Sequence, residues 1–306
     1  MRILVTGANG QLGRDLMLAL SSHEVLGTTR SKKLTEDLLP SAPVALDICN
    51  PQDVRAVLDG FQPQLVINCA AFHRVDEIER DCTTAFEVNA VAVHQLAREC
   101  RERDIPLLHV STDYVFDGAK RTPYVETDCP RPLSAYGASK LAGEHLLRAT
   151  WHKHYIVRTC GLYGHSGASG KGGNFVNTML KLAQEGKPIR VVDDQVCTPT
   201  STADLAAQIV ELIQTQAFGT YHITNDGECT WFEFALEIFR LADMRADVRP
   251  ISSAEYGAPA RRPPYSVLHN AALQALGIDN MRHWRAALAD YIGRYFAANS
   301  PETSNR

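Results

Sequence analysis

The feature that most constrains the fold is at the start of the chain, where a short apolar segment runs directly into spaced glycines. Residues 2–6 (Arg-Ile-Leu-Val-Thr) have the pattern of a buried strand, and Gly7, Gly10 and Gly13 follow as G-x-x-G-x-x-G. Apolar residues at helical spacing continue from Leu12. Glycines at a strand–helix junction allow close backbone approach, and a helix N-terminus attracts anions. The pattern predicts a dinucleotide pyrophosphate site; an ordinary strand–helix turn is the alternative.

Strand-like and helix-like segments alternate through the first half of the chain. Further β-rich apolar segments lie at residues 24–28, 44–48, 64–71, 107–112 and 155–160, and residues 83–101 carry the apolar stripe of a long helix. This alternation favours an α/β fold with a doubly wound parallel sheet of the Rossmann type. We assign residues 1–164 to a dinucleotide-binding domain and 165–300 mainly to a smaller C-terminal substrate lobe, with some segments returning to the Rossmann core; 301–306 form a polar tail.

The second predicted strand ends in a basic loop, residues 29–33 (Thr-Arg-Ser-Lys-Lys). A NAD-selective fold often places a carboxylate here, against the ribose 2′-hydroxyl. Arg30, helped by Ser31 or Lys32, could instead bind the 2′-phosphate of NADP, and the plain alternative is a loop of solvated cations. We therefore expect NADP as the cofactor, with NADPH preferred and NADH also accepted.

Tyr136 and Lys140 lie four residues apart at the start of a predicted helix and should share one face. A lysine charge favours the phenolate, so the pair could pass a proton to or from a carbonyl oxygen near neutral pH. The fifth predicted strand delivers Thr112 and Asp113 to the edge where ligands bind in open parallel sheets. Thr112 could therefore hydrogen-bond a substrate carbonyl beside Tyr136. Taken alone, the pair also fits an exposed tyrosine beside a solvated lysine.

Composition excludes several other classes of function. A formal net charge of −4 and a pI near 6.3 leave no electrostatic footprint for nucleic acid or a membrane surface. The chain has no run of 18 apolar residues and enters a strand at once without a signal-peptide layout, so we expect a cytoplasmic protein. The eight cysteines form no C-x-x-C pair and the eleven histidines no H-E-x-x-H pattern, so we expect reduced thiols and no metal site.

Five motifs occur together in order: the loop Gly7 to Gly13, Ser111 to Gly118 (STDYVFDG), Tyr136 to Lys140 (YGASK), Val191 to Gln195 (VVDDQ) and Ala260 to Pro263 (ARRP). Together they resemble the dTDP-4-dehydrorhamnose reductase family, a sugar-nucleotide branch of the extended short-chain dehydrogenase/reductases. The second, fourth and fifth motifs are the more specific ones. The resemblance implies NAD(P)H-dependent reduction of the 4-keto group of dTDP-4-dehydro-L-rhamnose to dTDP-L-rhamnose.

The resemblance also implies roles for individual residues. Thr112 would orient the keto oxygen, Tyr136 would donate the proton, and Lys140 would hold the nicotinamide ribose and lower the pKa of the tyrosine. The implied cofactor-binding residues are Gly7, Gly10, Gln11, Leu12, Gly13, Arg30, Asp47, Ile48, Ala70, Ala71, Tyr136 and Lys140. The implied substrate-binding residues are Thr112, Asp113, Tyr136, Asn174, Gln195 and Arg262.

Two departures from the family pattern leave the sugar open. Gly161 stands where similar reductases commonly carry a tryptophan, and residues 72–77 (Phe-His-Arg-Val-Asp-Glu) also differ. The pocket could take another sugar, in which case Gly161→Trp should improve use of dTDP-4-dehydro-L-rhamnose. Alternatively, Phe72 or Tyr163 fills the space. A third alternative is that the usual substrate is retained.

Alternative functions are another sugar-nucleotide reductase or epimerase, or a non-catalytic protein resembling the regulatory subunit of methionine adenosyltransferase. The expected partner is a sugar nucleotide, and a homodimer is left open.

Overall fold

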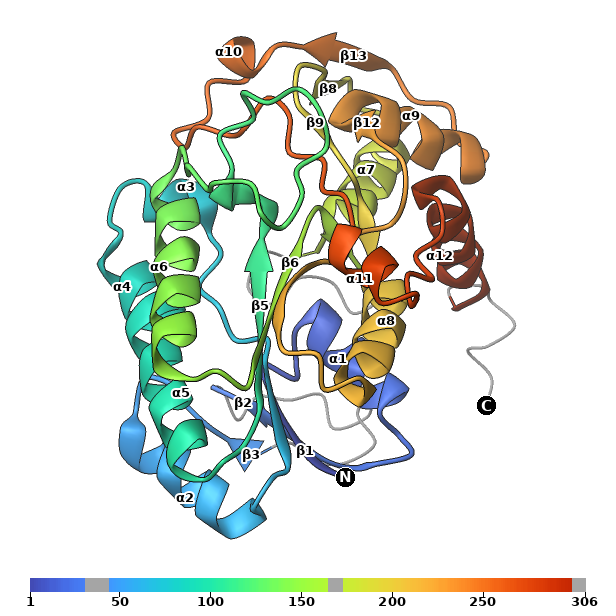
Figure 1. Ribbon diagram of the computed structural model, residues 1–306. Coiled ribbons are helices and arrows are strands. Elements are labelled where there is room, and N and C mark those ends of the chain that lie inside the picture. The colour runs from blue at the N-terminus through green and yellow to red at the C-terminus, as the bar shows by residue number, and fades with distance from the viewer. Residues whose placement is uncertain (31–43, 165–172, 299–306) are drawn as a thin grey trace.

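The computed structural model describes residues 1–30, 44–164 and 173–298, and its centre is a seven-stranded sheet (Figure 1). The strand order is β11-β6-β5-β4-β1-β2-β3, and every neighbouring pair is parallel. The strands are β1 (Arg2–Thr6), β2 (Glu24–Thr29), β3 (Val44–Ala45), β4 (Leu65–Asn68), β5 (Leu107–Thr112), β6 (His154–Thr159) and β11 (Gly219–His222). The predicted doubly wound parallel sheet is confirmed. Its strand order reverses between β1 and β4, and a crevice at such a reversal is where open α/β sheets bind ligands.

Helices cover both faces of this sheet (Figure 1). One face carries α1 (Gln11–Ala19), α8 (Thr202–Gln214) and α11 (Ala271–Ala275), and the other carries α2 (Pro51–Phe61), α5 (Ala92–Glu102) and α6 (Ala135–Thr150). Each face has its own buried apolar cluster, with Leu16 and Ile209 in the first and Leu58, Leu96 and Leu147 in the second. The sheet is therefore buried on both sides, as a parallel sheet requires.

The third strand is shorter than the sequence predicts. It ends at Ala45, and residues 46–48 continue as a loop. Asp47 Oδ1 accepts a hydrogen bond from the Cys49 amide at 3.0 Å, and this turn leads into α2. The local side-chain bond competes with strand pairing, which is the usual behaviour of aspartate at such positions.

The predicted long helix over residues 83–101 is also interrupted. It consists of α4 (Thr83–Phe86), a π-helical turn η2 (Glu87–Val91) and α5. A Cβ on Gly143 of α6 would lie 2.1 Å from the Asn89 carbonyl oxygen, so only glycine permits this approach. The Asn89 amide group bonds the backbone of Phe72 at 2.9 and 2.8 Å and the Ser139 hydroxyl at 3.0 Å. The widened turn thus joins α5, α6 and the segment after β4.

A smaller lobe lies beyond the carboxyl ends of β5 and β6 (Figure 1). Its elements are α7 (Phe175–Gln184), β8 (Ile189–Val192), β9 (Val196–Cys197), β12 (Cys229–Thr230), α9 (Trp231–Leu241), β13 (Val248–Ile251), α10 (Ser253–Tyr256) and α12 (Trp284–Ala298). Short connecting elements are α3 (Val75–Ile78), η3 (Asp113–Val115), β7 (Leu162–Tyr163) and β10 (Thr200–Ser201). The lobe has its own apolar core around Phe234 and Trp284. Between its parts, α8 and β11 belong to the main sheet and its helical layer.

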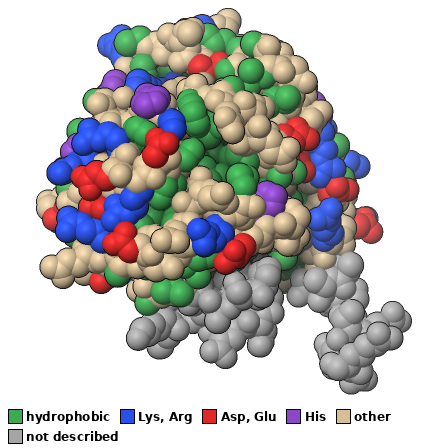
Figure 2. Space-filling model, turned by 60° about the horizontal axis from the view of Figure 1, so that its bottom comes forward, with side chains coloured by type: hydrophobic (Ala, Val, Ile, Leu, Met, Phe, Trp, Pro, Cys, Tyr) green, Lys and Arg blue, Asp and Glu red, His purple; other side chains and the backbone are tan. Residues whose placement is uncertain are grey.

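The surface carries charges of both signs. Figure 2 shows acidic and basic side chains intermixed on one face, with no continuous basic stripe there. None of the helices in the described ranges is both long enough and apolar enough to cross a membrane.

Candidate active site

The turn between β1 and α1 can be built only with glycine at two positions. Gly7 has a φ of +68°, and a Cβ there would lie 2.9 Å from the Ala70 amide nitrogen. A Cβ on Gly13 would lie 2.3 Å from the Gly7 carbonyl oxygen. Gly10 is the N-cap of α1 and offers no side-chain hydrogen bond, so the first amides of the helix, from Gln11 on, have no side-chain cap. Such a bare helix start fits a phosphate group.

The Gln11 side chain joins this glycine loop to the C-terminal lobe. Its Oε1 accepts hydrogen bonds from the Gly164 amide at 2.8 Å and from Asn174 Nδ2 at 2.9 Å. Asn174 is the N-cap of α7 and also donates to the Gly164 carbonyl at 2.8 Å. These contacts bring Asn174 to the glycine loop, whereas the sequence analysis placed it in the sugar pocket. The glycine-rich run at residues 164–173, which its sequence suggests as a lid, lies mostly outside the described residues.

The residues expected around the adenosine follow β2 and β3. Arg30 is exposed directly after β2, and Ile48 is buried in the loop that carries Asp47. Arg30 lies close enough to Cys49 for its charge to lower the pKa of that thiol, although burial dominates and raises the pKa to about 11. Arg30 and Asp47 therefore both lie near Cys49, and their contact with the adenosine stays a prediction. Ser31 and Lys32 lie outside the described residues.

Tyr136 and Lys140 come together with Thr112 at the carboxyl end of β5. Ser134 caps α6 by accepting a hydrogen bond from the Gly137 amide at 3.2 Å. The Tyr136 hydroxyl bonds the Thr112 side chain. The Lys140 ammonium or amine is buried, with Nζ 2.8 Å from the Val110 carbonyl oxygen. The structure thus assembles the three residues that the sequence analysis singled out.

Burial sets the protonation state of Tyr136. It raises the pKa of the phenol, the nearby charge of Asp113 raises it further, and the hydrogen bond with Thr112 only partly opposes this. These effects outweigh the lowering of this pKa by Lys140 that the resemblance implies. The reason is that Lys140 Nζ is bonded to β5, and desolvation penalises the phenolate. Tyr136 therefore keeps its proton at neutral pH, which is the form a proton donor needs.

Asp113 orients Thr112. Its Oδ1 accepts a hydrogen bond from the Thr112 hydroxyl at 3.0 Å, and its Oδ2 accepts one from Cys160 Sγ at 3.1 Å. Thr112 Oγ1 also accepts a hydrogen bond from the Tyr114 amide at 3.2 Å. The aspartate is buried, so its carboxylate acts through Thr112. The contact of Cys160 with Asp113 was not predicted, because the sequence shows only that Cys160 ends the sixth predicted strand.

Arg262 meets one of the two segments that depart from the family pattern. Its Nη2 lies 3.1 and 3.0 Å from the two carboxylate oxygens of Asp76, in α3. Its charge also acts on Tyr114, whose ring packs edge-on against Tyr136 at 5.9 Å. Arg262 therefore lies near the catalytic candidates, and its contact with the sugar nucleotide stays a prediction. Gln195 Nε2 donates a hydrogen bond to Ser253 Oγ at 2.7 Å.

The aromatic side chain beside Gly161 is Trp231. A Cβ on Gly161 would lie 3.4 Å from Trp231 Cη2 and 3.2 Å from the Pro199 Cα. Tyr163, one of the two aromatic residues proposed to fill this space, is instead buried in the lobe core. Trp231 opens α9 and packs against Phe175 with ring centroids 4.8 Å apart. Sequence reasoning missed it because the two positions are far apart in the chain.

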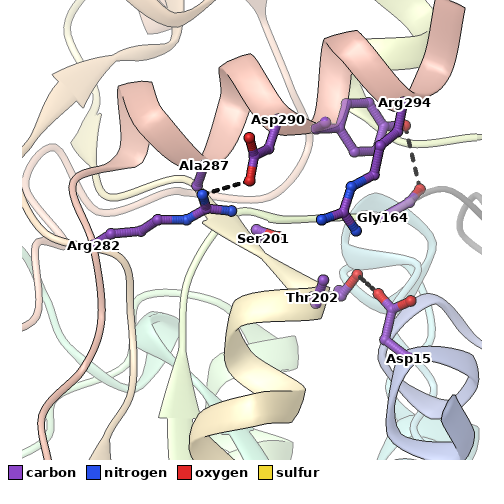
Figure 3. Close-up of a pocket in the computed structure, with 10 residues that line it drawn as sticks. Asp15, Gly164, Ser201, Thr202, Arg282, Ala287, Asp290 and Arg294 are labelled. Atoms are coloured by element: carbon purple, nitrogen blue, oxygen red, sulfur yellow. Dashed lines mark hydrogen bonds and ion pairs between the residues drawn. The ribbon is translucent and has the colours of Figure 1, made fainter. Parts of the chain in front are cut away.

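A separate small pocket lies where α1, α8 and α12 meet (Figure 3). Thr202 bonds Asp15 across it, and Arg282 pairs with Asp290 at 2.5 Å. These contacts connect the walls of the pocket, which lies at the packing interface between the Rossmann core and the C-terminal helix. It contains none of the catalytic candidates.

A glycine loop at the sheet reversal and a tyrosine–lysine pair at the end of β5 define a reductase of the short-chain dehydrogenase/reductase class. Within that class, the chain belongs to the dTDP-4-dehydrorhamnose reductase family, since the family model described as the RmlD substrate binding domain matches residues 1–296.

Three relatives illustrate the match. The dTDP-4-keto-6-deoxy-D-glucose reductase of Streptomyces niveus is 42% identical, and the alignment covers 94% of this chain and 95% of that one. A crystal structure of a dTDP-4-dehydrorhamnose reductase from Clostridium acetobutylicum has 41% identity and a TM-score of 0.87, with 96% and 99% covered. A dTDP-4-dehydrorhamnose reductase from Bacillus anthracis, solved in complex with NADP, has 38% identity and a TM-score of 0.84, again with 96% and 99% covered.

Proposed function

We propose that this protein uses NADPH to reduce the 4-keto group of a dTDP-linked deoxysugar, converting dTDP-4-dehydro-L-rhamnose to dTDP-L-rhamnose. The observation that carries the proposal is the group of Thr112, Tyr136 and Lys140 at the carboxyl end of β5. Relatives that are similar over nearly the whole chain are named as reductases of dTDP-linked 4-keto sugars, and one was solved with NADP.

The residues of this chain fit such a reaction. Bound NADPH would supply the hydride. Tyr136 stays protonated and donates its proton to the keto oxygen, while Thr112 holds the phenol hydroxyl in place. Lys140 binds the ribose beside the nicotinamide, and the start of α1 binds the pyrophosphate. Arg30 faces the adenosine end with a charge suited to a 2′-phosphate.

The remaining assignments extend this proposal. Asp47 and Ile48 would contact the adenine, Ala70 and Ala71 the ribose on the nicotinamide side, and Arg262 and Gln195 the sugar nucleotide. Asn174 would act at the glycine loop through Gln11. A cytoplasmic location and a homodimer are further expectations, and a sugar nucleotide remains the only partner proposed.

A second candidate substrate is dTDP-4-keto-6-deoxy-D-glucose, the compound in the name of the Streptomyces niveus relative. The observation that favours it is the origin of the aromatic ring at this place. Residue 161 is a glycine, and the ring beside it belongs to Trp231. An aromatic ring that reaches the pocket from α9 would contact a sugar from a different side.

Tyr136→Phe tests the proposed chemistry. It deletes the proton donor and keeps the ring, so kcat should fall about 100-fold or more while the Kd for NADPH stays within about twofold. Tyr221→Phe is the matched control, because that hydroxyl only donates to the Ala217 carbonyl at 2.5 Å. A Tyr136→Phe enzyme that kept half of the original rate would show that another group donates the proton.

A further inference from the structure

Behind the catalytic lysine lies a chain of buried hydrogen bonds that the proposed reaction does not use. Asn68 ends β4, His109 lies within β5, and Lys140 lies on α6; their exposed fractions are 0%, 0% and 1%. The Asn68 Nδ2 and His109 Nδ1 atoms are 3.1 Å apart, and His109 Nε2 and Lys140 Nζ are 3.1 Å apart. Polar groups buried this deeply are almost always hydrogen-bonded, so each donor should meet an acceptor.

The backbone fixes the orientation of the Asn68 amide. Asn68 Oδ1 accepts hydrogen bonds from the Ala70 amide at 3.1 Å and from the Thr6 hydroxyl at 2.6 Å. A backbone N–H can only donate, so the oxygen of the side-chain amide must be on that side. Turning the amide over would set two donors against each other at Ala70. The amide nitrogen of Asn68 therefore faces His109.

The Asn68 orientation in turn fixes the tautomer of His109. The amide nitrogen of Asn68 only donates, so His109 Nδ1 must accept and carries no proton. A neutral imidazole then has its proton on Nε2, which points at Lys140 Nζ. An ammonium group has three donors and no acceptor, whereas a neutral amine has a lone pair that can accept this bond. The same amine can still donate to the Val110 carbonyl at 2.8 Å.

We propose that Asn68 and His109 are positioning residues that favour the neutral amine of Lys140, so that at mildly alkaline pH the binding of NADPH takes up a proton. The inference rests on the proposed role of Lys140 at the cofactor ribose. The phosphates of a dinucleotide are negative and its ribose hydroxyls accept hydrogen bonds, so the bound state favours the ammonium form. Lys140 then releases His109 Nε2 and turns toward the ribose.

The surrounding charges are consistent with this balance. Burial lowers the pKa of Lys140 to about 8, with Glu144 on α6 and Cys69 after β4 opposing the shift. Glu144 is paired with Arg158 of β6 at 2.7 Å, which partly offsets its charge, and Tyr136 is protonated. Burial also holds the pKa of His109 well below its usual range, which keeps the imidazole neutral.

The tautomer can be measured on the unmodified full-length protein. Long-range proton–nitrogen NMR of ¹⁵N-histidine-labelled protein distinguishes a protonated ring nitrogen from an unprotonated one. His109→Gln would identify the His109 signal among those of the eleven histidines. At pH 8.5, the proposal expects a neutral ring with the proton on Nε2. A ring with its proton on Nδ1, or a doubly protonated ring, would overturn it without reference to any activity.

Proton uptake tests the functional half. Calorimetry of NADPH binding at pH 8.5, in two buffers of different ionisation enthalpy, should show uptake of about half to one proton for each NADPH bound. The Kd for NADPH should rise about tenfold from pH 7 to pH 9. No uptake together with a pH-independent Kd would contradict the proposal. Absence of NADPH binding would instead contradict the proposed function, and the tautomer would still be decided by NMR.

Asn68→Asp should reverse the direction of the hydrogen bonds that run from Asn68 through His109 to Lys140, by changing one group. A carboxylate oxygen facing His109 accepts a hydrogen bond from Nδ1–H. Nε2 then carries no proton and becomes the acceptor, so Lys140 can remain an ammonium. Proton uptake should then fall close to zero, and the Kd should change less than about twofold between pH 7 and pH 9. Thr6→Val is the matched control, because it removes the other bond to Asn68 Oδ1 at 2.6 Å and leaves the tautomer unchanged. Equal uptake in Asn68→Asp and the unmodified protein would count against the proposal.

Discussion

At the scale of single residues, the site depends on the hydrogen-bond partners of the Thr112 and Tyr136 hydroxyls. Thr112 donates to the buried Asp113 at 3.0 Å and is also hydrogen-bonded to the Tyr136 hydroxyl. Tyr136 therefore has a fixed direction and a pKa raised by burial, so it is a proton donor before any ligand arrives. Lys140 contributes through the ribose and through its own protonation state, which the bonds of its amine to β5 control.

Arg30 should determine the choice of cofactor. We expect Arg30→Ala to weaken NADPH binding roughly ten- to a hundredfold, because a charge-assisted bond to a phosphate contributes about 1.5 to 3 kcal/mol. The Kd for NADH, which has no 2′-phosphate, should hardly change. Titration of both cofactors into both proteins measures this. Arg101→Ala, an exposed arginine at the end of α5, is the control. Equal affinities of the unmodified protein for the two cofactors would refute the assignment.

Trp231 should contribute to substrate recognition. Its tip lies beside Gly161, at the place where similar reductases commonly carry a tryptophan. Trp231→Ala should lower kcat/KM for the sugar nucleotide about tenfold, since a lost aromatic contact costs up to about 1.5 kcal/mol. The Kd for NADPH should stay within about twofold. A parallel loss of NADPH affinity would mean that Trp231 merely supports the fold.

The structure also revises the expected effect of Gly161→Trp. Gly161 has a φ of +54°, and an added side chain would meet Trp231 and Pro199. A left-handed backbone conformation costs a non-glycine residue roughly 1–2 kcal/mol. We now expect this variant to lower the melting temperature and the activity, not to improve use of dTDP-4-dehydro-L-rhamnose. Thermal melts beside the kinetic comparison will separate the two effects, and a melting temperature at or above that of the unmodified protein would refute this revision.

At the scale of elements, the position of α6 depends on its close contact with the π-helical turn η2. Gly143→Ala would place a methyl group 2.1 Å from the Asn89 carbonyl, and backbone atoms cannot yield easily. We expect a loss of about 1–3 kcal/mol in the free energy of unfolding, together with reduced turnover because α6 carries Tyr136 and Lys140. Gly60→Ala in α2 is the matched control, since a Cβ there meets nothing within 4 Å. Urea unfolding of both variants measures the difference, and equal stabilities would argue against this contact.

The junction between β11 and β6 should make the protein sensitive to acid. His222 Nδ1 donates to the Tyr124 carbonyl at 3.0 Å, and burial and the charge of Arg158 lower the pKa of His222 from 6.5 to about 3. The unfolded chain therefore binds more protons below pH 6.5, so this neutral histidine makes stability fall as the pH drops from 6.5 toward 3.

His222→Asn tests this, because asparagine can keep the donor to Tyr124 without titrating. Between pH 7.5 and pH 5 the unmodified protein should lose about 2 kcal/mol more unfolding free energy than the variant. Urea unfolding at the two pH values gives both losses. Parallel losses would show that His222 is protonated in the folded state as readily as in the unfolded state.

At the scale of the whole molecule, the spacing of residues within single segments predicted those features of the fold and site that depend on local geometry. The glycine loop, the parallel sheet and the meeting of Thr112, Tyr136 and Lys140 follow from patterns within single segments and from the rule that strand ends share one edge. The π-helical turn, the Trp231–Gly161 neighbourhood and the Asn68–His109 pair were not predictable in this way. Each depends on contacts between elements far apart in the sequence, and no periodicity records such contacts.

The measurement that tests the central claim most directly is NADPH oxidation with dTDP-4-dehydro-L-rhamnose and with dTDP-4-keto-6-deoxy-D-glucose, each followed by identification of the product. We expect NADPH absorbance to fall in proportion to dTDP-L-rhamnose formed, with a higher kcat/KM for the rhamnose precursor and loss of this activity in Tyr136→Phe. A higher kcat/KM for the second compound would contradict the proposed substrate. No NADPH oxidation with either compound, in protein that binds NADPH, would contradict the proposed function itself.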